Sequence, residues 1–183
     1  MRSLEGKVAV VTGAGTGIGR ETAMALGRKG CRLAVCDIDT EALEALQREL
    51  ESAGVEVSTH RVDVSSREEM EAFAANVVDM HGSAQILINN AGVTVYATFE
   101  EHSIEDLEWI LGVNVWGILH GCKFFLPHLK AAGEGHIVNL SSVFGIIAPP
   151  LQTSYVASKF AVRGFSESLR AELAEYNVGV TSV

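Results

Sequence analysis

Short apolar runs alternate with longer segments of helical periodicity along the chain, and this alternation constrains the fold most strongly. Residues 8–11 are apolar at every position, which predicts a strand buried on both faces. Leu43, Leu46 and Leu50 recur on one helical stripe, and Ser66 and Glu69 have the spacing of a helix capping box. Strands are expected at 7–12, 32–37, 55–61, 85–89, 135–140 and 178–183, and helices at 17–29, 40–53, 66–80, 103–131 and 154–176.

Strands that alternate with helices form parallel units with right-handed crossovers. We therefore expect an α/β fold of the Rossmann type, a doubly wound parallel sheet of at least six strands with helices on both faces. The 183 residues are expected to form one domain, residues 1–183, because no repeat or Pro/Gly/Ser-rich linker divides them. Ligands of such sheets bind at the carboxyl ends of the strands.

Composition narrows the partners and the location. The chain has 14 Lys and Arg against 23 Asp and Glu, a net charge of −9, which argues against nucleic acid and anionic membranes as partners. The three cysteines lack CxxC spacing and the six histidines lack metal-binding spacing, so we expect no disulfide framework and no metal site. A reducing, cytoplasmic location fits the cysteines, and the N-terminal apolar run is too short for a signal peptide or membrane span.

A glycine-rich turn, residues 12–19, stands where the first strand should pass into a helix. Glycines let a backbone approach a pyrophosphate closely, while free N–H groups and the helix dipole favour the anion. The strand before it and the helix after it support a dinucleotide site over a purely structural turn. The candidate cofactor residues of this turn are Gly13, Thr16, Gly17, Ile18 and Gly19.

Asp37, at the end of the second expected strand, is the acid that often accompanies such a turn. Its carboxylate could accept hydrogen bonds from both hydroxyls of an adenosine ribose and would repel a 2′-phosphate, which favours NAD over NADP. The alternative is a solvated aspartate that caps the next helix, although Asp39 or Thr40 could do that.

Tyr155 and Lys159 lie one helical turn apart and therefore share a helix face. A nearby ammonium favours the phenolate, so this tyrosine could exchange protons near neutral pH. Ser142, just past the fifth expected strand, could hold a substrate oxygen as charge develops on it, with Ser141 as its rival. Alone, each of these features is compatible with an ordinary surface pair or a strand-end turn.

Two asparagine features complete the candidate site. Residues 89–92, Asn-Asn-Ala-Gly, follow the fourth expected strand at the same edge of the sheet, or form a turn without catalytic meaning. Asn114 lies inside the apolar helix, where its side chain needs a partner that a local bend or a bound water could provide. The alternative is a helix-packing asparagine among Gly112, Gly117 and Gly121.

Together these residues resemble the short-chain dehydrogenase/reductase family, ordinary short type, across essentially the whole chain. The resemblance implies that Tyr155 is the catalytic acid/base and that Ser142 positions the substrate oxygen. It implies that Lys159 binds the nicotinamide ribose and favours the phenolate of Tyr155, and that Asn114 anchors a proton-relaying water. The implied purine and ribose contacts are Asp63, Val64, Asn90, Ala91 and Gly92.

The resemblance implies hydride transfer between NAD(H) and a secondary alcohol or ketone, with the 4-pro-S hydride of NADH as the one transferred. The apolar loop 143–151, with Val93, Val95, Tyr96 and Phe99, could line an apolar substrate pocket or pack under a lid or at a subunit contact. Helices 103–131 and 154–176 are expected to pair subunits into a homodimer or homotetramer.

One departure from the family concerns the C-terminal part. Family members usually continue past the sixth strand with a substrate-covering lid and a last strand, which this chain is expected to lack because it stops at Val183. An uncovered sixth strand would leave a sheet edge open to association. A non-catalytic dinucleotide-binding or scaffold protein is the alternative function; the joint presence of Asn114, Ser142, Tyr155 and Lys159 argues against it.

Overall fold

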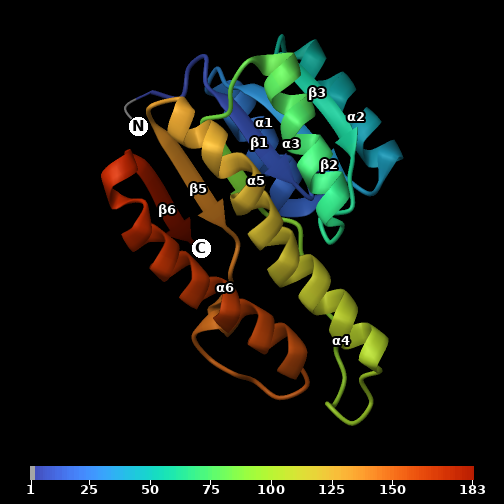
Figure 1. Cartoon of the computed structure of the whole chain (residues 1–183). Coiled ribbons are helices and arrows are strands. Elements are labelled where there is room, and N and C mark those ends of the chain that lie inside the picture. The colour runs from blue at the N-terminus through green and yellow to red at the C-terminus, as the bar shows by residue number, and fades with distance from the viewer. Residues whose placement is uncertain (1–2) are drawn as a thin grey trace.

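The computed structural model describes residues 3–183, so the first two residues of the expected domain lie outside it. Six parallel strands form one sheet in the order β3-β2-β1-β4-β5-β6, with helices on both faces (Figure 1). This confirms the doubly wound fold. The strands are β1 Val8–Thr12, β2 Arg32–Asp37, β3 Val57–Arg61, β4 Ile86–Asn89, β5 Gly135–Asn139 and β6 Val178–Ser182.

The parallel register brings the candidate site residues to one edge. Thr12 of β1 pairs with Cys36 of β2, and Asn89 of β4 pairs with Asn139 of β5, so these strands end level with one another. The chain leaves β1 for β2 on one side and later returns to β4 on the other side of β1. The crevice of the sheet is therefore at the carboxyl ends of β1 and β4.

Each face of the sheet has its own apolar core, because successive side chains of a strand point to opposite faces. The helices are α1 Gly17–Arg28, α2 Thr40–Ser52, α3 Arg67–His81, α4 Ile104–Leu111, α5 Gly117–Ala131 and α6 Thr153–Glu172. Val8 and Val10 pack toward α3, α5 and α6, whereas Ala9 and Val11 pack toward α1 and α2. All four of these side chains are fully buried.

The long helix expected at 103–131 is divided by a π-helical turn at Gly112–Trp116. A π-turn holds an extra residue and shifts the helix face that follows it. By length and composition alone, the stretch Ile104–Ala131 is long and apolar enough to span a membrane. Here Ile110, Asn114, Ile118 and Phe125 of this stretch are buried within the fold, as in a core helix.

Two helix ends differ from the sequence expectation. The Ser66 hydroxyl accepts from the Glu69 backbone N–H, but the Glu69 carboxylate accepts from the Asp63 N–H, so only half of the expected capping box forms. Ser103 and Asp106 form a complete capping box at the start of α4. The last helix ends at Glu172, and a short 3₁₀ turn, Ala174–Tyr176, follows it.

An apolar groove lies over α5, lined by Trp116, Phe124 and Phe165 among others. Trp116 is 56% exposed there. The groove lies on the two helices expected to pair subunits, and that pairing stays a prediction.

Candidate active site

The turn after β1 has the glycines it needs for two different reasons. A Cβ on Gly19 would lie 2.1 Å from the Gly13 carbonyl oxygen, and one on Gly13 would lie 2.7 Å from the Ala91 Cα. Gly19 thus permits close packing within the turn, and Gly13 permits close packing of the turn against the segment after β4. Gly17 has a φ of +54°, and a Cβ there would meet no atom within 4 Å, so its side faces open space at the start of α1.

The turn is fastened to the end of β4 by hydrogen bonds. The Asn90 amide donates to the Thr12 and Gly13 carbonyls at 3.0 and 2.9 Å. The Thr12 hydroxyl accepts from the Asn90 and Ala91 backbone N–H groups at 3.0 and 3.2 Å. Asn90 thereby fixes the width of the crevice between β1 and β4.

Asp37 lies across this turn at the end of β2. One carboxylate oxygen accepts from the Gly15 N–H at 2.8 Å, and the other accepts from the Asp39 N–H at 3.2 Å. The cap of α2 is Asp39, whose side chain accepts from the Ala42 N–H. Asp37 is therefore not needed as a helix cap, and it lines the hollow above the glycine turn.

Asn114 is fully buried in the π-turn and joins three segments. Its Oδ1 accepts from the Val93 N–H at 2.8 Å, and its Nδ2 donates to the Val93 carbonyl at 2.9 Å and to the Ser158 hydroxyl at 3.1 Å. The Ser158 hydroxyl in turn donates to the Tyr155 carbonyl at 2.7 Å. Both amide hydrogens of Asn114 are used within the protein. Asn114 could therefore hold a water only through its Oδ1 or its own main-chain carbonyl.

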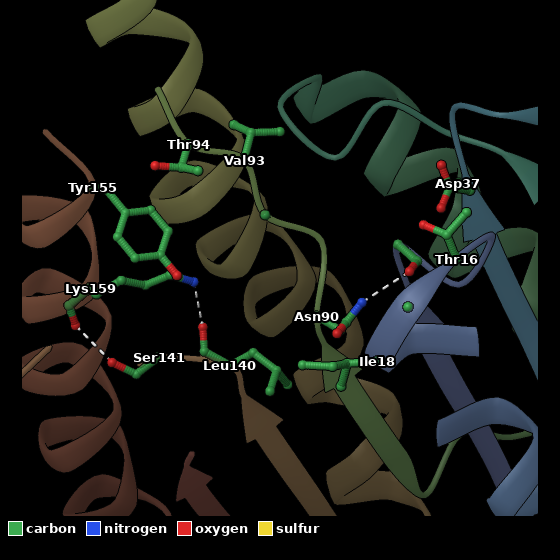
Figure 2. Close-up of a pocket in the computed structure, with 13 residues that line it drawn as sticks. Thr16, Ile18, Asp37, Asn90, Val93, Thr94, Leu140, Ser141, Tyr155 and Lys159 are labelled. Atoms are coloured by element: carbon green, nitrogen blue, oxygen red, sulfur yellow. Dashed lines mark hydrogen bonds between the residues drawn. The ribbon is translucent and has the colours of Figure 1, made fainter. Parts of the chain in front are cut away.

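Tyr155 and Lys159 extend from α6 into the same hollow, opposite Thr16 and Asp37 (Figure 2). The Lys159 ammonium lies 5.3 Å from the centre of the Tyr155 ring and donates to the Leu140 carbonyl at 2.8 Å. Lys159 is 3% exposed, and burial lowers its pKa from 10.5 to about 8. The fold therefore holds a costly cation at this point.

The two serines after β5 have different surroundings. The Ser141 hydroxyl donates to the Lys159 carbonyl at 2.9 Å (Figure 2). The Ser142 oxygen accepts from the Phe144 N–H at 3.1 Å, and among residues 3–183 its hydroxyl proton has no hydrogen-bond acceptor. Ser142 lines a hollow adjoining that of Tyr155, with Ser141 shared by both.

Nine of the sequence-predicted residues line a single hollow. They are Gly13, Thr16, Gly17, Ile18, Asp37, Asn90, Gly92, Tyr155 and Lys159. Asp63, Val64 and Ala91 line a second hollow that shares Asp37 and Gly92 with the first. Gly19 lies beneath the turn, and Asn114 lies behind Val93.

Several residues that build this hollow are not among those predicted from the sequence. Thr12, Leu140 and Ser158 each supply a hydrogen bond to a predicted site residue, and Thr94 lines the hollow beside Tyr155. Backbone carbonyls such as that of Leu140 leave no trace in residue type. The Ser158 hydroxyl, placed beside Lys159 in the Tyr-x-x-x-Lys segment, was the one available signal.

Comparison with known proteins agrees with this geometry. The family model described as short chain dehydrogenase matches residues 7–183. The chain belongs to the short-chain dehydrogenase family. This places it in a family of oxidoreductases with Rossmann folds.

Individual relatives match all or nearly all of this short-chain dehydrogenase chain. It is 47% identical to "Putative oxidoreductase SadH" of Mycobacterium tuberculosis, covering 100% of this chain and 67% of that protein. A short-chain dehydrogenase/reductase from Burkholderia phymatum, solved in complex with NAD, has a TM-score of 0.97 and 38% identity. A metagenomic short-chain oxidoreductase in complex with NADP has a TM-score of 0.94 and 35% identity.

Both solved relatives are longer than this chain. The chain spans 66% of the Burkholderia phymatum protein and 82% of the metagenomic one, against 100% and 98% of its own residues. It therefore matches about two thirds of the length of the first two relatives named here.

The residues present fit a nicotinamide dinucleotide. The open side of Gly17 at the helix start suits a pyrophosphate, since backbone N–H groups and the helix dipole favour an anion there. The ammonium of Lys159 carries three N–H groups and donates to one protein acceptor, Leu140. Donors remain for the hydroxyls of a ribose.

The burial of Lys159 makes its pH dependence testable. Unfolding restores the pKa of 10.5, so between pH 8 and 10.5 the unfolded chain binds more protons and the free energy of unfolding rises with pH. Lys159→Met should remove this rise in the free energy of unfolding and should stabilise the protein at pH 7 by about 2 kcal/mol. The gain is smaller than the free energy that corresponds to the pKa shift, because the Leu140 carbonyl loses its hydrogen-bond donor. Urea unfolding at pH 7 and 10 measures both effects.

The matched control is Lys123→Met, because Lys123 is an exposed lysine on α5. It should leave the pH dependence of unfolding as in the wild type. A Lys159→Met protein that is less stable than the wild type at pH 7 would show that the buried ammonium is not a net cost.

Proposed function

We propose that this chain carries the cofactor site and reacting centre of an enzyme that transfers a hydride between NAD(H) and a secondary alcohol or ketone. The observation that carries the proposal is the meeting of Tyr155 and Lys159 with the glycine turn in one hollow (Figure 2). A phenol and an ammonium placed together at a dinucleotide site suit proton transfer to or from an oxygen.

Each residue has a definite part in the proposed mechanism. A bound nicotinamide supplies the hydride acceptor or donor. The Tyr155 hydroxyl gives its proton to the substrate oxygen in reduction, and the phenolate takes a proton from the alcohol in oxidation. The Lys159 ammonium favours the phenolate and binds ribose hydroxyls.

Ser142 and Asn114 support this proton transfer. The hydroxyl proton of Ser142 is free to donate to the substrate oxygen as negative charge develops there, whereas the Ser141 proton is already used by the Lys159 carbonyl. Asn114 holds Val93 and, through Ser158, the turn of α6 that carries Tyr155. It acts as a positioning residue, and its remaining acceptors are where a relaying water would bind.

The proposed substrate is an apolar or bulky secondary alcohol or ketone. Tyr96, Phe99, Ile146 and Ile147, on the two loops beside Thr94 and Ser142, are each more than half exposed. Large apolar side chains exposed on loops that adjoin polar site residues along the chain suit an apolar ligand.

The proposed cofactor is NAD. The carboxylate of Asp37 lies at the end of β2, where a ribose 2′-substituent is expected. Among the residues that line the two hollows, Lys159 is the only basic one, and it lies across from Asp37 (Figure 2). A 2′-phosphate would therefore meet a carboxylate without a compensating cation.

Replacement of Tyr155 tests the proposed reaction. Tyr155→Phe should lower kcat for a ketone panel by about 10²- to 10⁴-fold, the usual contribution of a general acid/base. Binding of NADH, followed by its fluorescence, should change little, because the ring and Lys159 remain. Tyr176→Phe, in the distant 3₁₀ turn, is the control that should keep full turnover. Undiminished turnover by Tyr155→Phe would contradict the mechanism.

Replacement of Asp37 tests the cofactor preference. The wild type should bind NADH at least about tenfold more tightly than NADPH, a difference of about 1.4 kcal/mol. Asp37→Ser should narrow that ratio, because it removes the charge that repels a 2′-phosphate.

Asp39→Ser is the matched control for Asp37→Ser. Serine caps a helix about as well as aspartate, so this variant removes one carboxylate beside Asp37, keeps the cap of α2 and should leave the NADH/NADPH ratio unchanged. Titration calorimetry with both nucleotides gives the ratios. A wild type that prefers NADPH would exclude the proposed role of Asp37.

A further inference from the structure

A second hollow adjoins the one that holds Tyr155, and it has an apolar character of its own. It is built from the segments that follow β2, β3 and β4, closed on the far side by α4 and the π-turn. Its lining includes Ile38, Val62, Asp63, Val64, Trp109 and Val113. Since it shares Asp37, Gly92 and Val93 with the first hollow, one elongated ligand can occupy both.

Two large apolar side chains at this hollow are left in contact with solvent. Trp109 is 49% exposed and Ile38 is 64% exposed, whereas Val62 and Val64 between the strand ends are buried. Trp109 of α4 and Val113 of the π-turn both line this hollow. An indole held half-exposed at the rim of an apolar hollow offers a flat surface to a flat ligand.

The polar groups of the hollow are few and specific. Asp63 Oδ1 accepts from the Ser65 N–H and hydroxyl at 2.9 and 2.7 Å, and its other carboxylate oxygen has no protein donor among the described residues. An apolar slot with one unused carboxylate oxygen matches a purine that carries an exocyclic amine.

We propose that Trp109 is the outer wall of the purine subsite and that its indole contacts the adenine of the bound dinucleotide. This rests on the proposed function only for the class of cofactor. The family resemblance implies purine contacts from the strand side, Asp63 and Val64; Trp109 adds an aromatic contact from the helix side. Val113, which lines the same hollow, directly precedes Asn114 in the π-turn, so one element borders the purine subsite and supports Val93.

The chain contains two tryptophans, Trp109 and Trp116, which makes the inference measurable by fluorescence. The probe is 5′-AMP, which carries the purine and ribose but no nicotinamide. In Trp116→Phe, where Trp109 is the sole tryptophan, 5′-AMP should quench the indole emission saturably. In Trp109→Phe, where Trp116 in the groove over α5 is the sole tryptophan, the emission should not respond.

Affinity gives a second readout. Trp109→Ala should bind 5′-AMP about three- to tenfold more weakly, the range expected for loss of an aromatic contact, while Trp116→Ala should bind it as the wild type does. Circular dichroism melting of the variants checks that each is folded. If Trp109→Ala does not fold, the quenching measurement on Trp116→Phe still tests the inference, because that variant retains Trp109.

The inference is overturned if emission of the Trp116→Phe protein does not respond to 5′-AMP at concentrations that calorimetry shows to be saturating. It is equally overturned if Trp109→Ala binds 5′-AMP as tightly as the wild type. Quenching by 5′-AMP without any carbonyl turnover would reject the proposed reaction and leave the purine subsite standing. Turnover with NADH, combined with no response of the Trp109 emission to 5′-AMP, would reject the subsite alone.

Discussion

The hydrogen bonds of one buried amide, Asn114, connect the parts on which the site depends. The side chain binds both backbone groups of Val93, after β4, and the hydroxyl of Ser158, on α6. Leaving such a group unpaired in the core would cost about 1–3 kcal/mol for each lost partner, so the loop and the helix are held together strongly. The π-turn around Asn114 is the local irregularity that accompanies this arrangement, as π-turns commonly do at functional sites.

Around this connection the fold assembles two features that do not favour stability. The first N–H groups of α1 have no partner within the helix and lie beside the open side of Gly17, and Lys159 is buried with a carbonyl as its protein partner. Both features are explained by an anionic, hydroxyl-rich ligand that completes the hydrogen bonding of the crevice. The packing of the rest of the core offsets the stability lost at this site. Proteins commonly tolerate locally unfavourable groups at their functional sites.

Much of this organisation could be predicted from the sequence. Apolar runs that alternate with helical segments predict a parallel sheet, and Gly13, Asp37 and Tyr155 all follow or end strands on the carboxyl edge of such a sheet. The strand and helix ends agree to within a residue or two, apart from the end of α6. Asn114 indicated a local bend or a bound water within the long helix, but the π-turn itself could not be predicted, since the apolar pattern continues through it and its extra residue leaves no signature. Nor could residue type show that Glu69 would bind the Asp63 N–H instead of closing its capping box, or that Trp109 would face the purine side.

The most direct test of the central claim, that Tyr155 and Lys159 address one face of a nicotinamide ring, is the stereochemistry of hydride transfer. NADH labelled with deuterium at the 4-pro-S or the 4-pro-R position would be supplied with a ketone that the enzyme reduces, and the label in the alcohol measured by mass spectrometry. Because both side chains lie on one wall of the hollow, the account predicts transfer from a single face, which the family resemblance identifies as 4-pro-S. Deuterium from the 4-pro-R position, or from both, would contradict it.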